Sequence, residues 1–269
     1  SSAPRARRHR SRCGWAGASD PVSNPPQGER SARRVVLAAE ALRFSWPGVK
    51  TPCIDIEAFR ITAGESVFLH GPSGCGKSTL LSLLAGVLVA DEGRVTLLGH
   101  DWSKLSGAQR DRSRVAHVGY IFQQFNLLPY LSVIDNVLLP CRFSARRESQ
   151  AARNGSARQE AEHLLAQMGL DRNLWKRQAL QLSVGQQQRV AAARALIGQP
   201  EVVIADEPTS ALDEDRREAF LDVLLTACAQ NHSALVFVSH DQRIAQRFVR
   251  HVLLPEINRA ATSAMAVDA

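Results

Sequence analysis

The sequence lacks the features of a secreted or membrane-spanning protein. Its five cysteines are an odd number and include no C-x-x-C pair, so neither a disulfide framework nor a zinc site is indicated. No apolar run approaches the roughly 20 residues of a membrane-spanning helix, and the N-terminus has no apolar stretch like that of a secretory signal. We therefore expect a protein of a reducing, cytosolic compartment that can still dock on a membrane protein.

Positive charge is concentrated at one end of the chain. The formal charge is +7, and residues 1–34 hold most of it, because eight arginines there face only Asp20 and Glu29. The nearly neutral remainder argues against a nucleic-acid groove. Residues 1–34 are also poor in apolar side chains, which predicts a disordered Arg-rich extension. A tail that touches anionic lipid is the alternative to a solvated extension.

Strand-like and helical segments alternate in the rest of the sequence. Three short strand-like runs are predicted at Val35–Ala39, Ala58–Ile61 and Arg94–Leu98. Four further strand-like runs are Ser66–His70, Ala116–Phe122, Val202–Ala205 and Leu235–Val238. Together with helix-forming stretches such as Lys77–Ala85 and Gln186–Ile197, they predict an α/β core with a mainly parallel sheet. Residues 127–185 are expected to form an inserted helical subdomain, with a surface loop or frayed helix over Arg142–Arg158.

A glycine-rich segment follows the first strand-like run. Residues 71–78, GPSGCGKS, fit the pattern G-x-x-x-x-G-K-[ST], in which glycines let backbone N–H groups converge on a phosphate chain at a helix N-terminus. Lys77 is expected to reach the β- and γ-phosphates, and the Ser78 hydroxyl to ligate Mg²⁺. The residues expected to bind the nucleotide here are Gly71, Ser73, Gly74, Cys75, Gly76, Lys77, Ser78 and Thr79.

Acidic residues end the run Val202–Ala205. Ligands bind at the carboxyl ends of strands in open α/β sheets, so Asp206 and Glu207 are expected beside the phosphate loop. Asp206 suits Mg²⁺, and Glu207 suits positioning or deprotonating the water that attacks the γ-phosphate. His240 also follows a strand-like run and can hold the γ-phosphate and Glu207, although a lone histidine there is more often plain polar surface.

Residues 35–253 resemble the ATP-binding subunits of ABC transporters, because six motifs occur in that family's order. They are the loop at 71–78, Gln123 after Tyr120-Ile121-Phe122, Leu182-Ser183-Val184-Gly185-Gln186, Asp206-Glu207, Ser210-Ala211-Leu212-Asp213 and Ser239-His240-Asp241. The resemblance implies a P-loop NTPase core with an N-terminal antiparallel β subdomain and an inserted α-helical subdomain. The ATPase domain would span 35–255, with a short tail at 256–269.

The resemblance also implies roles for residues outside the phosphate loop. Gln123 would bind Mg²⁺ and the attacking water and link them to the helical insert. Ser183, Gly185 and Gln186 would contact the γ-phosphate held by a second subunit, and Asp213 would lie at the subunit interface.

An aromatic side chain would stack on adenine, with Trp46 the best match and Phe44 the second. The alternative is that Trp46 is only a packed aromatic near a turn.

The signature segment departs from the family pattern L-S-G-G-Q at one position. Val184 replaces the first glycine, and a β-branched residue would be strained there if φ were positive. Because Ser183 and Gly185 are retained, we expect ordinary backbone geometry at Val184 and an active, somewhat slower enzyme.

The predicted function is an ATPase, with ATP and Mg²⁺ as cofactors, that drives an integral membrane permease. It would work as a homodimer, or paired with another ATPase subunit, at the cytoplasmic face of the inner membrane. A soluble ATPase acting on DNA or ribosomes is the alternative class, but the chain has no coiled-coil or zinc-bearing insertion and no second ATPase domain.

The segment from Phe122 to Pro129 is similar to the lipoprotein-releasing and macrolide-exporter group. Amino-acid-type importers remain the alternative, although they usually carry a C-terminal domain that is not found here.

Overall fold

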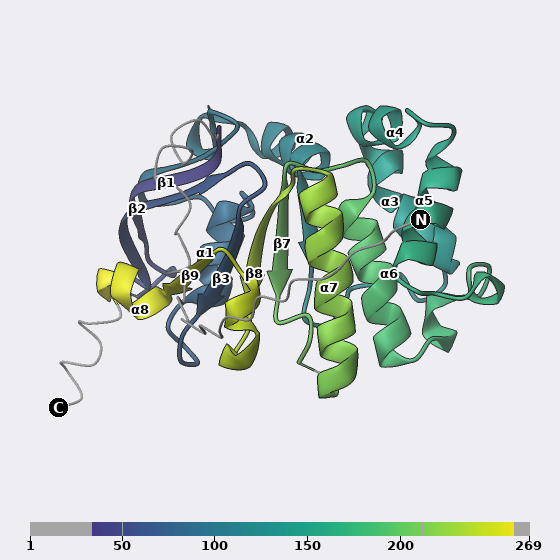
Figure 1. Cartoon of the computed structure of the whole chain (residues 1–269). Helices are drawn as coiled ribbons and strands as arrows, with labels where there is room; N and C mark the ends of the chain where they lie inside the picture. The colour runs from purple at the N-terminus through teal and green to yellow at the C-terminus, as the bar shows by residue number, and fades with distance from the viewer. Residues whose placement is uncertain (1–33, 50, 211, 261–269) are drawn as a thin grey trace, which may run out of the picture. The chain divides into compact units, whose positions relative to one another are not determined.

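The computed structural model describes residues 34–49, 51–210 and 212–260, which belong to one compact unit of the chain (Figure 1). Nearly all of the predicted disordered extension lies outside the described residues. The strands are β1 (Val35–Phe44), β2 (Ile54–Thr62), β3 (Ser66–His70), β4 (Glu92–Leu97), β5 (His100–Asp101), β6 (Val118–Ile121), β7 (Val202–Asp206), β8 (Ala234–Val238) and β9 (Arg250–Leu253). The α-helices are α1 (Lys77–Leu84), α2 (Gly107–His117), α3 (Val133–Phe143), α4 (Ala145–Ala151), α5 (Ala157–Gln167), α6 (Val184–Leu196), α7 (Glu214–Gln230) and α8 (Leu254–Ile257). Within these ranges no helix combines the length and the apolar character needed to cross a bilayer.

An antiparallel sheet contains the first two strands, in the order β2-β1-β4-β5. β1 and β2 pair from Val35 opposite Thr62 to Phe44 opposite Ile54. In the segment that joins them, the N–H of Val49 donates to the carbonyl of Trp46. The antiparallel β subdomain is therefore confirmed, and Trp46 lies just beyond the end of β1.

The second sheet is parallel, in the order β6-β7-β8-β3-β9. Its central strands are buried on both faces, as β7 shows: Val203 and Ala205 pack with the helical insert and α7, whereas Val202 and Ile204 pack with α1 and the antiparallel sheet. A strand alternates its side chains between two faces, so burial on both requires the continuous apolar runs seen in the sequence. The predicted α/β core is confirmed.

The parallel arrangement brings the functional segments to one edge. β6, β7, β8 and β3 are consecutive neighbours in the sheet, so their carboxyl ends at Ile121, Asp206, Val238 and His70 lie along the same side. β6 is shorter than the predicted strand over Ala116–Phe122, because the first two of those residues belong to the last turn of α2.

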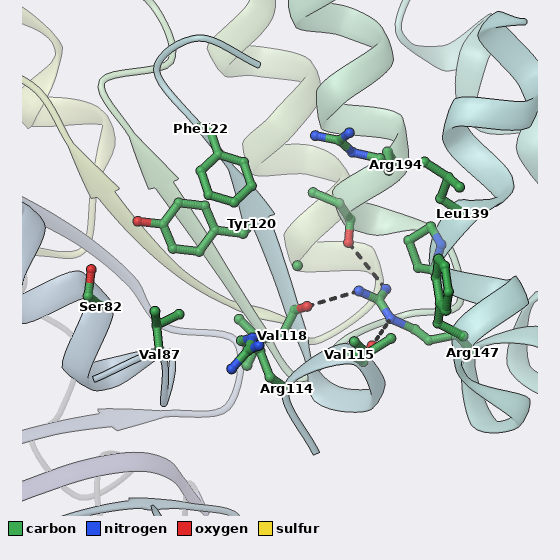
Figure 2. Close-up of a pocket in the computed structure, with 14 residues that line it drawn as sticks. Ser82, Val87, Arg114, Val115, Val118, Tyr120, Phe122, Leu139, Arg147 and Arg194 are labelled. Atoms are coloured by element: carbon green, nitrogen blue, oxygen red, sulfur yellow. Dashed lines mark hydrogen bonds between the residues drawn. The ribbon is translucent and has the colours of Figure 1, made fainter. Parts of the chain in front are cut away.

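The helical insert contains a well-formed helix where a loop or frayed helix is predicted. Within Arg142–Arg158, α4 is anchored by Arg147, whose side chain is only 1% exposed. Its guanidinium donates to the carbonyls of Val115 and Val118 (Figure 2). It also donates to the carbonyls of Ala195 and Ile197. Burial lowers the pKa of Arg147 to about 10. The local sequence is polar, but this tertiary contact decides the structure of the segment.

Candidate functional site

The phosphate loop connects β3 to α1. Gly76 caps α1 with φ of 99°, a backbone conformation that L side chains rarely adopt. A Cβ on Gly76 would also lie 2.8 Å from Cδ1 of Ile54. The loop from Pro72 to Gly74 is exposed, so its backbone groups are open to a ligand at the N-terminus of α1.

Lys77 reaches back over this loop. Its Nζ donates to the carbonyls of Gly71 and Pro72, both at 2.9 Å, and the residue is 8% exposed. An ammonium group has three donors, so one remains available to a phosphate oxygen. The lysine is thereby held over the loop with its charge at the place where phosphates would bind.

Asp206 ends β7 next to this loop. Burial raises the pKa of its carboxyl, and the neighbouring charge of Glu207 raises it further, while a hydrogen bond with Ser78 and the charge of Lys77 oppose the shift. A hydroxyl and a carboxylate oxygen thus lie together. Mg²⁺ is commonly bound by one or two such protein oxygens plus substrate phosphates, so these residues fit the metal.

Glu207 and His240 form a close pair at the ends of β7 and β8. Nε2 of His240 lies 2.5 Å from Oε1 of Glu207. Glu207 has a φ of 46°, which costs roughly 1–3 kcal/mol in a non-glycine residue and is typical of active sites. Its N–H donates to the carbonyl of Val238 at 3.0 Å, so strand pairing holds the strained residue beside the histidine.

Gln123 lies in an exposed turn after β6. In the same turn, Phe125 and Asn126 have φ of 59° and 46°. Arg194 of α6 donates to the carbonyl of Phe125 at 2.5 Å and to that of Asn126 at 2.7 Å. Burial lowers the pKa of Arg194 to about 10. The turn is therefore fastened to the helix that begins at the signature segment.

The signature segment forms the N-terminus of α6. Ser183 and Gln186 make a capping box, in which the Ser183 N–H donates to Oε1 of Gln186 at 2.9 Å and the Gln186 N–H to Oγ of Ser183 at 3.4 Å. These residues and Gly185 line a hollow of about 180 Å³, in which no phosphate-loop residue takes part. Within one copy of the described chain, the structure does not bring the two motifs together.

Val184 is the first residue of α6 and has ordinary geometry. Its φ is not positive, as expected, and its side chain is half-exposed. We expect Val184→Gly to change the ATP turnover rate by less than about tenfold, because no strain is relieved and glycine in a helix costs only up to about 1 kcal/mol relative to alanine. A steady-state ATPase assay measures this, and a hundredfold increase would contradict it.

The remaining predicted site residues are Trp46 and Asp213. Trp46 is 46% exposed and meets buried Phe44 edge-on, with ring centroids 5.3 Å apart. Of these two predicted candidates for stacking on adenine, Trp46 is the one whose ring is exposed. Asp213 caps α7 by accepting from the N–H of Arg216 at 3.0 Å and remains largely exposed.

Comparison with known proteins identifies the family of this chain. The ABC transporter family profile matches residues 55–210. The chain belongs to the ABC transporter family. It is 41% identical over 196 residues to the lipoprotein-releasing system ATP-binding protein LolD of Legionella pneumophila strain Paris, covering 73% of this chain and 83% of that protein. It is 37% identical to the macrolide export ATP-binding/permease protein MacB of Pasteurella multocida, covering 80% of this chain and 32% of that protein.

A solved ABC cassette has the same fold. The ATP-binding cassette MJ0796, in a dimeric post-hydrolysis state bound to ADP and Pi, superposes with a TM-score of 0.71 at 29% identity, covering 81% of this chain and 93% of that chain. This ABC protein is accordingly an ATP-binding and ATP-hydrolysing transporter subunit, and the LolD and MacB relatives do not favour the importer alternative.

Sequence reasoning missed two arginines that support the ABC motifs. Arg194 fastens the turn of Gln123, and Arg217 of α7 forms an ion pair with Asp241, the residue after His240. The helix capped by Asp213 is thereby tied to the segment of His240. No sequence spacing indicated the contacts of Arg194 and Arg217, because they join residues of separate elements.

A separate cavity of about 470 Å³ lies between the core of this ABC subunit and its helical insert. Most of its lining is apolar, including Val87, Phe122, Leu139 and Phe143, and it contains arginines but no acidic side chain (Figure 2). Three of these lining residues, Val87, Phe122 and Phe143, are exposed large apolar side chains, with Phe143 73% exposed. Exposed apolar side chains that cluster in this way mark an interaction site, whereas single ones do not.

Proposed function

We propose that this chain is the ATPase of a lipoprotein-release or exporter type transporter, working as a dimer on a membrane permease. The observation that carries the proposed chemistry is the Glu207–His240 pair, 2.5 Å apart and beside Asp206. The LolD and MacB relatives support this transporter type.

Each predicted site residue has its own role in the proposed ATP hydrolysis. The phosphate loop and Lys77 bind the phosphates, and Trp46 stacks on the adenine. Ser78, Asp206 and Gln123 would hold Mg²⁺, which when bound neutralises charge on the β- and γ-phosphate oxygens. Glu207 accepts a proton from the attacking water. His240 donates a hydrogen bond that orients Glu207 and the γ-phosphate.

A dimer completes the site. Ser183 and Gly185 lie at an exposed helix N-terminus apart from the phosphate loop of their own chain, and helix N-termini attract anions. In the proposed dimer, the signature segment of each copy meets the γ-phosphate bound by the other. The dimeric cassette structures are consistent with this arrangement.

The cavity between core and insert is the proposed docking site of the permease, at the cytoplasmic face of the membrane. Its wall includes Phe122, next to Gln123, and Arg194, which holds the turn of Gln123. An apolar permease segment seated there would therefore press on the turn that reaches the nucleotide.

Phe143→Asp is expected to abolish association with the permease, because it places a charge on the apolar rim. The ATP affinity should stay within about twofold, since Phe143 lies outside the nucleotide site. Co-purification of the tagged ATPase with an integral membrane protein measures association. Val249→Asp is the matched control, because Val249 is 72% exposed and does not line the cavity. Permease binding that survives Phe143→Asp, or recovery of ribosomes or DNA in place of a membrane protein, would refute the proposed partner.

A further inference from the structure

Asn258 is a buried polar residue near the C-terminal end of the described chain. It is 1% exposed, and its amide is fully engaged. Nδ2 donates to the carbonyls of Cys53 at 3.0 Å and Cys75 at 3.3 Å. Oδ1 accepts from the N–H groups of Asp55 at 2.8 Å and Ala260 at 3.3 Å. One side chain therefore joins β2, the phosphate loop and the chain after α8.

The contact with Cys75 acts on the phosphate loop itself. The carbonyl of Cys75 and the N–H of Gly76 belong to one peptide unit, which is planar and trans, so they point in opposite directions. A donor inside the protein that binds the Cys75 carbonyl therefore keeps the Gly76 N–H pointing away from the protein interior. Gly76 has φ of 99° and no Cβ, so its own backbone preference does not define this plane.

The other contacts of Asn258 connect this peptide to the adenine side of the site. The N–H of Cys53 donates to the carbonyl of Phe44 at 2.8 Å, and Phe44 supports the ring of Trp46. Beneath the loop, Ile54 fills the space where a Cβ of Gly76 would lie. Asn258 thus fixes the phosphate loop relative to the strand that carries the proposed adenine platform.

We propose that Asn258 is a positioning residue for nucleotide binding: it orients the Cys75–Gly76 peptide so that the Gly76 N–H is aimed at the phosphates. This inference rests on the proposed role of residues 71–78. We expect Asn258 to affect the affinity for ATP and not the rate of hydrolysis, because it contacts neither Glu207 nor His240 in the described structure. Loss of the amide leaves the part-buried carbonyls of Cys53 and Cys75 without this donor and lets the peptide rotate.

Asn258→Ala tests the proposal in the full-length protein. We expect the Kd for ATP to rise about tenfold, equivalent to about 1.4 kcal/mol, while kcat at saturating ATP stays within about twofold. Calorimetric titration gives the Kd and a steady-state assay gives kcat. The ¹⁵N–¹H resonance of Gly76 should also shift. An unchanged Kd, or a fall in kcat alone, would overturn the proposal.

Asn258→Asp is the second variant, because it keeps the size of the side chain and its acceptor for Asp55. The ionised carboxylate cannot donate to Cys53 or Cys75, but the protonated form can donate to one of them. The affinity of this variant should therefore recover toward that of the wild type as the pH is lowered, relative to wild type measured in parallel. A loss of affinity that does not depend on pH would count against the proposal.

Two control variants distinguish a wrong role for Asn258 from general destabilisation and from a wrong assignment of the phosphate loop. Ser233→Ala removes another buried hydrogen bond, from Oγ of Ser233 to the carbonyl of Pro200 at 2.5 Å, and should leave the Kd for ATP unchanged. An equal loss in Ser233→Ala would mean that general destabilisation explains the result, and the proposal would fall. Lys77→Ala tests the phosphate loop independently: if it weakens binding and Asn258→Ala does not, only the role of Asn258 is wrong.

Discussion

Glu207→Gln should lower the rate of ATP hydrolysis by about 10²–10⁴-fold, the usual contribution of a general base. Glutamine keeps the size of the side chain and an oxygen for Nε2 of His240, which lies 2.5 Å from Glu207 in the native structure. It cannot accept a proton from water, so bound ATP is not consumed. We therefore expect the affinity for ATP to be retained and a closed dimer to accumulate.

Three measurements check this result. A steady-state assay gives the rate, calorimetry gives the Kd for ATP, and size-exclusion chromatography with and without ATP gives the dimer fraction. Glu218→Gln is the matched control, because Glu218 makes a surface ion pair with Arg247 at 2.7 Å and lies outside the site. Its rate should remain within about twofold of wild type. Unchanged hydrolysis in Glu207→Gln would remove Glu207 from the mechanism.

Lys77→Ala should weaken nucleotide binding itself. A hydrogen bond to a charged group contributes about 1.5–3 kcal/mol, so the Kd for ATP should rise roughly 10- to 150-fold. The loss also frees the carbonyls of Gly71 and Pro72, which Lys77 holds at 2.9 Å. The loop should then be less well ordered for its ligand.

Lys104→Ala is the control for this substitution, because Lys104 is exposed and lies away from the phosphate loop. Titration with ATP should give a wild-type Kd for the control and a weaker one for Lys77→Ala. A Kd within about twofold of wild type in Lys77→Ala would show that the lysine does not bind the phosphates.

The sequence was informative where a function requires a local backbone pattern. A glycine loop between an apolar strand and a helix defines a phosphate site, because the spacing of the glycines and the lysine sets the geometry within a few residues. Short apolar runs, such as Val202–Ala205 and Leu235–Val238, predicted the central strands, since strands buried on both faces exclude polar residues. Asp206 and Glu207 could be placed for the same reason, as they directly follow such a strand.

The sequence was less informative where a charged side chain donates hydrogen bonds to backbone carbonyls far away in the sequence. The polar composition of Arg142–Arg158 predicts a loop or frayed helix, yet Arg147 of α4 is buried against four carbonyls from two separate parts of the chain, residues 115–118 and 195–197. Arg194 binds the turn of Gln123 in the same way. No propensity or spacing encodes such contacts, because they exist only after the elements have packed.

By itself, the sequence determined that this protein binds a nucleotide and which family it resembles, since those motifs act through neighbouring residues. The tertiary structure decided the contacts between separate elements, which no sequence pattern indicated. It fastened the turn of Gln123 to Arg194 and placed Asn258 behind the peptide of Gly76. The sequence had suggested that His240 holds Glu207, and the structure places their side chains 2.5 Å apart. The physical reason is that hydrogen bonds and ion pairs between residues far apart in the chain depend on parallel strand order and helix packing.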